Sequence, residues 1–219
     1  MPRTISPGAV VERIWAIYRA EAGVLLPVAA VLFAIQLVIA LVLPIGLALV
    51  LSVLFWVLSL LYQGFVVELV SQSRAGIETG STGDLFRAVT PALGPLLLIS
   101  IVFAVGVMIG FVLIIIPGLM LITFWCVVVP VEVLEHRGVF GSFSRSRELV
   151  RGNGWNVFGT IVIVYVAVLA ISLLAAVVTA PLGHVGRDII QWAVNVAITP
   201  VVALSASVLY FELIDAGAG

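Results

Sequence analysis

Six stretches of the chain are almost entirely apolar and close to 20 residues long, and this feature restricts the fold more than any other. We place them at residues 23–43, 44–70, 95–116, 119–134, 156–179 and 189–211. A helix of about 20 apolar residues crosses the hydrocarbon core of a bilayer and satisfies its own backbone hydrogen bonds there. The composition agrees, because 63% of the residues are hydrophobic and 10% are charged. We therefore predict an all-α, polytopic membrane protein with six transmembrane helices.

The outer turns between these stretches combine proline with glycine. The pairs are Pro44 and Gly46, Pro117 and Gly118, and Pro181 and Gly183. Proline removes a helical donor and glycine permits a reversal of the chain, so each pair predicts a tight turn. The six spans then form three hairpins, at 23–70, 93–135 and 156–213, within one membrane domain that covers residues 1–219.

The remaining segments are more polar, and two of them have amphipathic patterns. Residues 1–22 contain an expected interfacial helix at 7–20, which begins at the Ser6-Pro7 start signal. Residues 136–155 form a basic amphipathic segment with a second surface helix at 139–151. Residues 71–92 are expected to be a cytoplasmic loop in which Asp84 caps a short helix, and residues 214–219 are a tail.

Arginine sets the expected orientation, since all ten cationic residues are arginines. Three lie before the first span, two between the second and third, and four between the fourth and fifth; only Arg187 lies on the other side. Cytoplasmic segments of membrane proteins retain such positive charge. The 9:1 division predicts that both termini are cytoplasmic, in the inner membrane of a bacterial or archaeal cell.

One pattern recurs with each hairpin, because every second helix ends in a glutamate between apolar residues. These are Glu68, Glu132 and Glu212. Together with the turns and the surface segments, they suggest a degenerate threefold repeat of surface helix plus hairpin. The alternative is that short membrane turns generally favour proline and glycine, and that membrane helices generally end at polar residues.

A carboxylate at a helix C-terminus faces the negative end of the helix dipole, so a nearby cation should compensate it. The candidate partners, which could equally hold lipid headgroups, are Arg13, Arg19, Arg87, Arg145, Arg147 and Arg151. The competing interpretation is an acidic cytoplasm-facing cavity for a cation or a proton. Pro130 and Pro200 are the expected hinges, and Pro130 should bend the short fourth span just before Glu132.

Residues 116–159 contain three local motifs. They are Ile116-Pro117-Gly118, the segment Pro130 to Glu135, and the run Ser146-Arg147-Glu148-Leu149-Val150-Arg151-Gly152. Through them the chain resembles the membrane domain of the glycerophosphoryl diester phosphodiesterase family. The resemblance implies an all-helical membrane unit, which in some relatives is fused to a soluble phosphodiesterase barrel that has no counterpart here. His136-Arg137-Gly138 resembles the catalytic motif of that barrel, but it follows a membrane helix and is expected to be an interfacial loop.

These observations favour a non-enzymatic membrane module that acts as a scaffold, a partner subunit or a lipid-handling protein. Its expected partners are membrane lipids, and it could associate with a second copy or another membrane protein. The alternative is a small transporter or channel. We expect no cofactor, no metal site and no nucleic-acid binding, because no phosphate-binding loop, metal-ligand spacing or nucleophile motif occurs.

Overall fold

The computed structural model describes residues 5–42, 44–76 and 81–217, and these residues form helices without any strand. The helices are α1 (Pro7–Ala20), α2 (Ala22–Val42), α3 (Ile45–Arg74), α4 (Thr82–Val89), η1 (Thr90–Ala92), α5 (Leu93–Leu113), α6 (Ile115–Trp125), α7 (Val128–Glu135), α8 (Gly138–Val150), α9 (Gly154–Thr179) and α10 (His184–Gly217). Six helical stretches among them are long and apolar enough to cross a membrane, as predicted. Parts of the predicted loop 71–92 and tail 214–219, and the first residues of 1–22, lie outside the described residues.

The second hairpin turns earlier than predicted. Its turn is at Ile114, whose backbone is extended (φ −166°, ψ 153°), whereas Pro117 lies in the first turn of α6. Proline is tolerated there because the first N–H groups of a helix have no intrahelical partner. The fourth span therefore covers 21 residues, Ile115–Glu135, and is not shorter than a bilayer requires.

Gly118 does not form the turn but lets two helices approach each other. A Cβ atom built on Gly110 of α5 would lie 2.9 Å from the Cα atom of Gly118, and one built on Gly106 would lie 2.6 Å from the ring of Trp125. The Gly106/Gly110 spacing thus permits a close approach of two helices, and this approach lies within the hairpin itself.

The two prolines expected to bend helices behave differently. The fourth span is interrupted at Cys126 and Val127, which separate α6 from α7. Pro130 explains the break, because it lacks the N–H group that would bond to the carbonyl of Cys126 four residues earlier. Pro200, in contrast, lies inside α10 without interrupting it.

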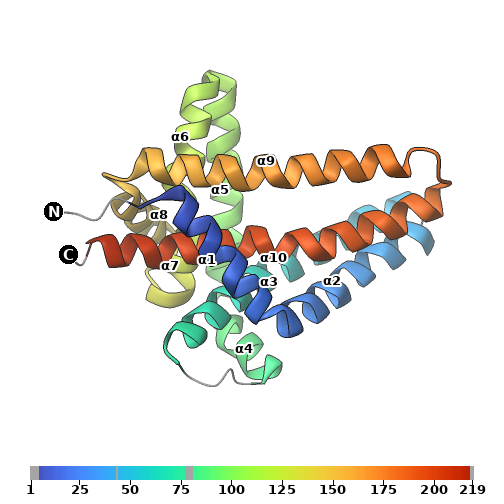
Figure 1. The fold of residues 1–219 in the computed structure, drawn as a ribbon, viewed down its shortest axis with the longest axis horizontal. Helices are drawn as coiled ribbons and strands as arrows, with labels where there is room; N and C mark the ends of the chain where they lie inside the picture. The colour runs from blue at the N-terminus through green and yellow to red at the C-terminus, as the bar shows by residue number, and fades with distance from the viewer. Residues whose placement is uncertain (1–4, 43, 77–80, 218–219) are drawn as a thin grey trace.

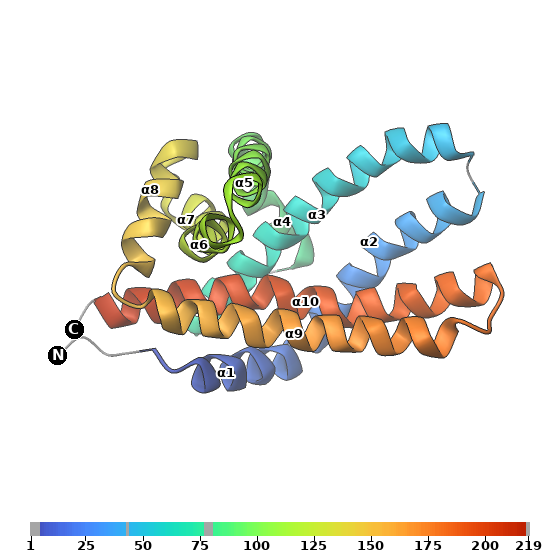
Figure 2. The same cartoon turned by 90° about the horizontal axis from the view of Figure 1, so that it is seen from above.

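The three hairpins diverge from a shared region (Figures 1 and 2). The α2–α3 and α9–α10 hairpins point the same way and separate toward their tips, whereas the α5–α6 hairpin runs across them. Within the second hairpin, α7 packs against α3, α5, α8 and α10, whereas α6 packs mainly on α5.

We call the shared region the hub and the outer parts of the three hairpins the arms. The hub comprises residues 60–70, 127–133 and 203–216 together with α1, α4 and α8, and it contains most of the fully buried side chains, among them Phe65, Val131 and Leu204. The arms, which comprise residues 31–56, 101–119 and 162–189, have many exposed apolar side chains. An apolar surface of this kind is typical of helices that face lipid.

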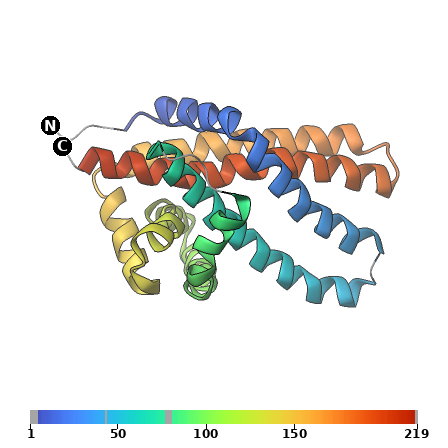
Figure 3. The same cartoon turned by 90° about the horizontal axis from the view of Figure 1, so that it is seen from below.

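The order of elements repeats three times as a short helix followed by a hairpin. The short helix α4 packs on α3, and α8 packs on α6 and α7, so each contacts the hairpin before it. The first short helix, α1, packs on α9 and α10 of the last hairpin, which closes the cycle (Figure 3).

A hydrogen bond of Tyr18 joins α1 to α10. The Tyr18 hydroxyl donates to the carbonyl of Ala197 at 3.3 Å, and burial raises the pKa of Tyr18, so this hydroxyl stays protonated.

The start of α4 corrects one prediction. Its N-cap is Ser81, and Asp84 is the third residue of the helix. The backbone N–H of Asp84 donates to the Ser81 hydroxyl oxygen at 3.3 Å, and this hydroxyl donates to the Asp84 carboxylate at 2.7 Å. This reciprocal arrangement resembles a capping box, with aspartate in the position that glutamate usually occupies.

Candidate functional site

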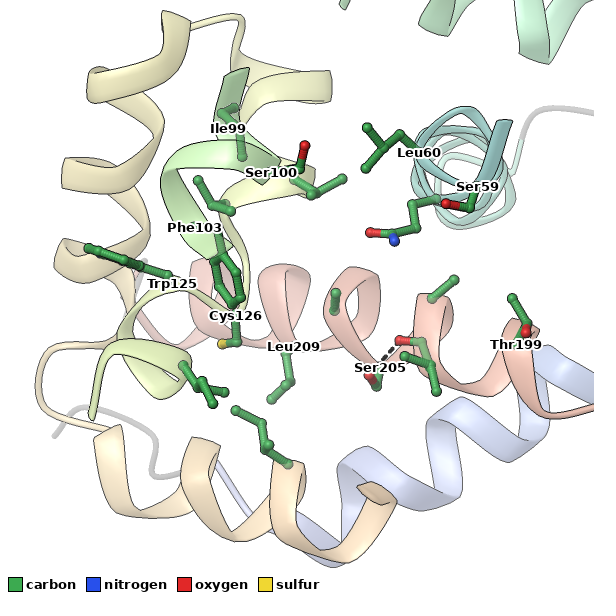
Figure 4. A pocket seen from close by; sticks show the side chains of 18 of the residues that line it. Ser59, Leu60, Ile99, Ser100, Phe103, Trp125, Cys126, Thr199, Ser205 and Leu209 are labelled. Carbon is green, nitrogen blue, oxygen red and sulfur yellow. Dashed lines mark hydrogen bonds between the residues drawn. The ribbon is translucent and has the colours of Figure 1, made fainter. Parts of the chain in front are cut away.

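A cavity of about 400 Å³, which we call the hub cavity, lies between the hub and the arms (Figure 4). It is lined by residues from α3, α5, α6, α7, α9 and α10, so all three hairpins contribute to it. Most of the lining is apolar and aromatic, but five side chains in membrane-crossing helices are amides or aliphatic hydroxyls: Ser59, Gln63, Ser100, Thr199 and Ser205. None of the lining residues is charged.

The three serines satisfy their own donors. Ser59, Ser100 and Ser205 each donate to a carbonyl three residues earlier in the same helix, at 2.6, 2.8 and 2.6 Å. Gln63 and Thr199 have no side-chain hydrogen bond to any part of the chain that the structure describes. The sequence shows Gln63 and Ser100 only as separate polar positions within spans, and their convergence depends on contacts between hairpins that no local pattern reveals.

The three glutamates of the repeat have different partners. Glu212 forms an ion pair with Arg13 of α1, which is the predicted type of contact. Glu132 is 3% exposed and accepts a hydrogen bond at 2.7 Å from the Ser142 hydroxyl of α8, so a neutral side chain takes the place of the expected arginine. Glu68 accepts at 2.9 Å from Gln72 one turn later in its own helix. None of the three lines the hub cavity.

Glu135 makes the arginine contact that is expected of Glu132 in the second hairpin. It is not among the predicted site residues. Its carboxylate accepts from the Nε atoms of Arg137 and Arg145 at 2.6 and 3.2 Å, and from the Tyr210 hydroxyl at 3.0 Å. This network joins α7, α8 and α10. Glu135 is the last residue of α7, so the argument from the helix dipole applies to it more strongly than to Glu132, and this position could have identified it.

The remaining arginines divide into paired and unpaired side chains. Arg87 pairs with Asp84 at 3.3 Å, and Arg74 with Asp215 at 2.7 Å. Arg19 lies over the ring of Trp15, and Arg147 lies over the ring of Phe124, 5.9 Å from its centroid. Within the described ranges, neither Arg147 nor Arg151 has a carboxylate partner, and both side chains are exposed.

These two arginines stand beside an apolar groove. The groove has a volume of about 640 Å³ and runs between α6 and the start of α9; Arg151 and the exposed Trp155 line it together with Ile116, Leu119, Met120, Thr123, Phe124 and Phe158. A smaller hollow of about 250 Å³ adjoins it, shares Phe124 and Arg151 with it, and adds Arg147, Ser144 and Glu148. Glu148 is itself paired with Arg145 at 3.7 Å.

The motif His136-Arg137-Gly138 forms the turn between α7 and α8. His136 and Gly138 both have positive φ angles, 49° and 72°, and Arg137 pairs with Glu135. No group of three or more His, Cys, Asp or Glu side chains suited to a metal ion is found in the described part of the chain. Comparison of the chain with protein-family models, curated proteins and solved structures finds no match.

Proposed function

We propose that this chain is a non-enzymatic integral membrane module that binds anionic lipids through arginines on the cytoplasmic side of a bacterial or archaeal inner membrane. The observation that carries the proposal is the pair Arg147 and Arg151, which have no carboxylate partner among the described residues and stand at one end of an apolar groove. A phospholipid matches both parts of this arrangement, with its phosphate at the guanidinium groups and an acyl chain in the groove.

The chemistry of the groove supports a lipid more than a soluble anion. From Phe124 to Ile116 the groove follows nine residues of α6, a distance of about 12 Å at the rise of an α-helix. Its walls are mainly aliphatic and aromatic, and Trp155, which is 87% exposed, lies next to the arginine end. Tryptophan and arginine favour the level of lipid headgroups, whereas apolar side chains favour the hydrocarbon.

The transporter alternative has less support from the geometry. It requires carboxylates that face a cavity, but Glu132 and Glu212 are bonded to Ser142 and Arg13 of the short helices, and the hub cavity has no charged lining. These contacts are better suited to fixing the short helices against the hairpins. The resemblance to the phosphodiesterase membrane domain and association with a partner protein stay predictions.

Native mass spectrometry of the detergent-purified protein tests the proposal. We expect phosphatidylglycerol to remain bound in preference to phosphatidylcholine, and the double variant Arg147→Ala/Arg151→Ala to weaken phosphatidylglycerol binding by roughly tenfold or more, since charge-assisted hydrogen bonds are lost. Arg187→Ala at the tip of the third hairpin is the control and should leave binding unchanged. Equal retention of both lipids, or unchanged binding in the double variant, would contradict the proposal.

A further inference from the structure

The hub cavity has a composition different from that of the arginine groove. Both are largely apolar, but the groove is lined by Arg151, whereas the cavity is lined only by uncharged side chains. The two therefore suit ligands of different charge, because a charged headgroup placed in the cavity would be desolvated without a counterion.

We propose that the hub cavity binds an uncharged lipid whose head carries hydroxyl and ester groups, such as a mono- or diacylglycerol. The unpartnered amide of Gln63 offers two donors and an acceptor, and the unpartnered Thr199 hydroxyl offers one donor and an acceptor. The oxygens of Ser59, Ser100 and Ser205 donate to their own helices and can still accept a hydrogen bond. Such a set matches a ligand with both hydroxyl and carbonyl groups.

The location of these groups favours a bound ligand that can reach them, since Gln63 is exposed and Thr199 is half-buried. Gln63 and Thr199 lie in helices that cross the membrane, where an amide or hydroxyl without a partner is costly. Gln63 comes from the first hairpin, Ser100 from the second and Thr199 from the third, so a bound lipid can be contacted by side chains of all three hairpins.

The size and the rim of the cavity fit this ligand class. A volume of about 400 Å³ lies in the range of small-molecule sites, which is about 300–1,000 Å³. Trp56 of α3 and Tyr165 of α9 line the cavity and are 37% and 54% exposed, so the lining of the cavity reaches the surface of the protein. An acyl chain can leave the cavity there, into the lipid, while the polar head stays inside.

Tryptophan fluorescence measures this binding directly, since Trp56 and Trp125 line the cavity. Monoacylglycerol brominated on its acyl chain should quench the fluorescence of the detergent-purified protein in a saturable way. Gln63→Leu should weaken the apparent affinity by roughly fivefold to tenfold, as expected for the loss of one or two hydrogen bonds. Gln36→Leu is the matched control, because Gln36 is an exposed glutamine in the same hairpin outside the cavity, and it should bind normally.

Two further variants keep the test decisive. Ala206→Phe places a large ring at the cavity wall and should abolish saturable quenching. Ser100→Ala is the mildest change and should weaken monoacylglycerol binding by roughly threefold. It provides the test if Gln63→Leu elutes as an aggregate. The double variant Arg147→Ala/Arg151→Ala should not affect the binding of monoacylglycerol, so the two sites can be tested separately. The proposal is overturned if Gln63→Leu binds monoacylglycerol with the same apparent affinity as Gln36→Leu. It is also overturned if Gln63→Leu changes the oligomeric state of the protein, from dimer to monomer, but leaves the quenching unchanged.

Discussion

The hub and the arms are built from the same continuous helices but are stabilised in different ways. Helix α10 shows the contrast within one element: from Ala203 to Ala216 most of its side chains are buried against α1, α3, α7 and α8, whereas residues 184–199 are exposed or half-buried. Helix α9 is strongly apolar, yet among the candidate spans it is the least enclosed, with 6% of its most apolar 18 residues buried. The hydrophobicity of a helix therefore does not indicate its burial within the protein, because in lipid an apolar side chain need not be covered by protein.

This comparison has a consequence for stability. Membrane helices associate through packing and polar contacts, since lipid removes the hydrophobic driving force that acts between helices in water. The hub has interlocked side chains and buried polar contacts such as that between Ser142 and Glu132, whereas in the second arm the close approach of Gly110 and Gly118 lies within one hairpin. We therefore expect substitutions in the hub to lower the free energy of unfolding and matched substitutions in the arms to have little effect.

The largest difference should come from a matched pair of leucines. Leu204 is fully buried in the hub, and Leu174 is 65% exposed in the third arm. Leu204→Ala should reduce the free energy of unfolding by about 2–5 kcal/mol, because it leaves a cavity in a packed core. Leu174→Ala should change it by about 0.5 kcal/mol or less. Thermal and denaturant unfolding in detergent, followed by circular dichroism, measures both; equal losses would remove the distinction between hub and arms.

A polar contact of the hub should give the next largest effect. Ser142→Ala removes the hydroxyl that donates to buried Glu132, and an unsatisfied buried acceptor costs about 1–3 kcal/mol. Ser144→Ala, on an exposed position of the same helix, is the control. If both variants unfold at the same denaturant concentration, the link between α7 and α8 does not depend on this hydrogen bond.

The features that depend on local pattern could be predicted from the sequence. Apolar runs of about 20 residues located the six spans, and amphipathic segments located α1 and α8. Pro117 predicts the reversal between the two helices of the second hairpin, yet proline also fits the first turn of a helix. The reversal is therefore at Ile114, three residues earlier than predicted.

The features that depend on contacts between hairpins could not be predicted in this way. The packing of α7 against α3, α8 and α10, which anchors the second hairpin in the hub, is one of them. The choice of Ser142 as the partner of Glu132, and the meeting of Gln63 with Ser100, are likewise set by tertiary packing over long sequence separations. Periodicity identifies the face of a helix but not which helix covers it.

Two glycines of α5 should respond differently to alanine, which tests packing inside an arm. A Cβ atom at Gly110 meets the backbone of Gly118 at 2.9 Å, whereas one at Gly94 meets nothing within 4 Å. Gly110→Ala should therefore destabilise the α5–α6 hairpin by about 1–3 kcal/mol, since backbone must move. Gly94→Ala meets no such contact and should change the free energy of unfolding by about 0.5 kcal/mol or less, because the gain in helix propensity is offset by crowding of the new Cβ atom against the ring of Pro95. The same unfolding assay applies, and an equal effect of both changes would show that α5 and α6 are not in close contact.

The smallest effect should come from the ion pair that closes the cycle of short helices. Arg13 and Glu212 join α1 to the last hairpin, but their side chains are 46% and 25% exposed, so solvent screens the pair and a coupling of about 0.2–1 kcal/mol is expected. A double-mutant cycle with Arg13→Gln and Glu212→Gln measures it, and the more exposed pair Arg87 and Asp84 is the comparison. A coupling at Arg13 and Glu212 that is no larger than this comparison would mean that α1 is held by its apolar face, on which Val10 and Ile14 are almost fully buried. In that case the recurring glutamate would position the helix end without stabilising it, and the hub would depend on packing at this junction as it does around Leu204.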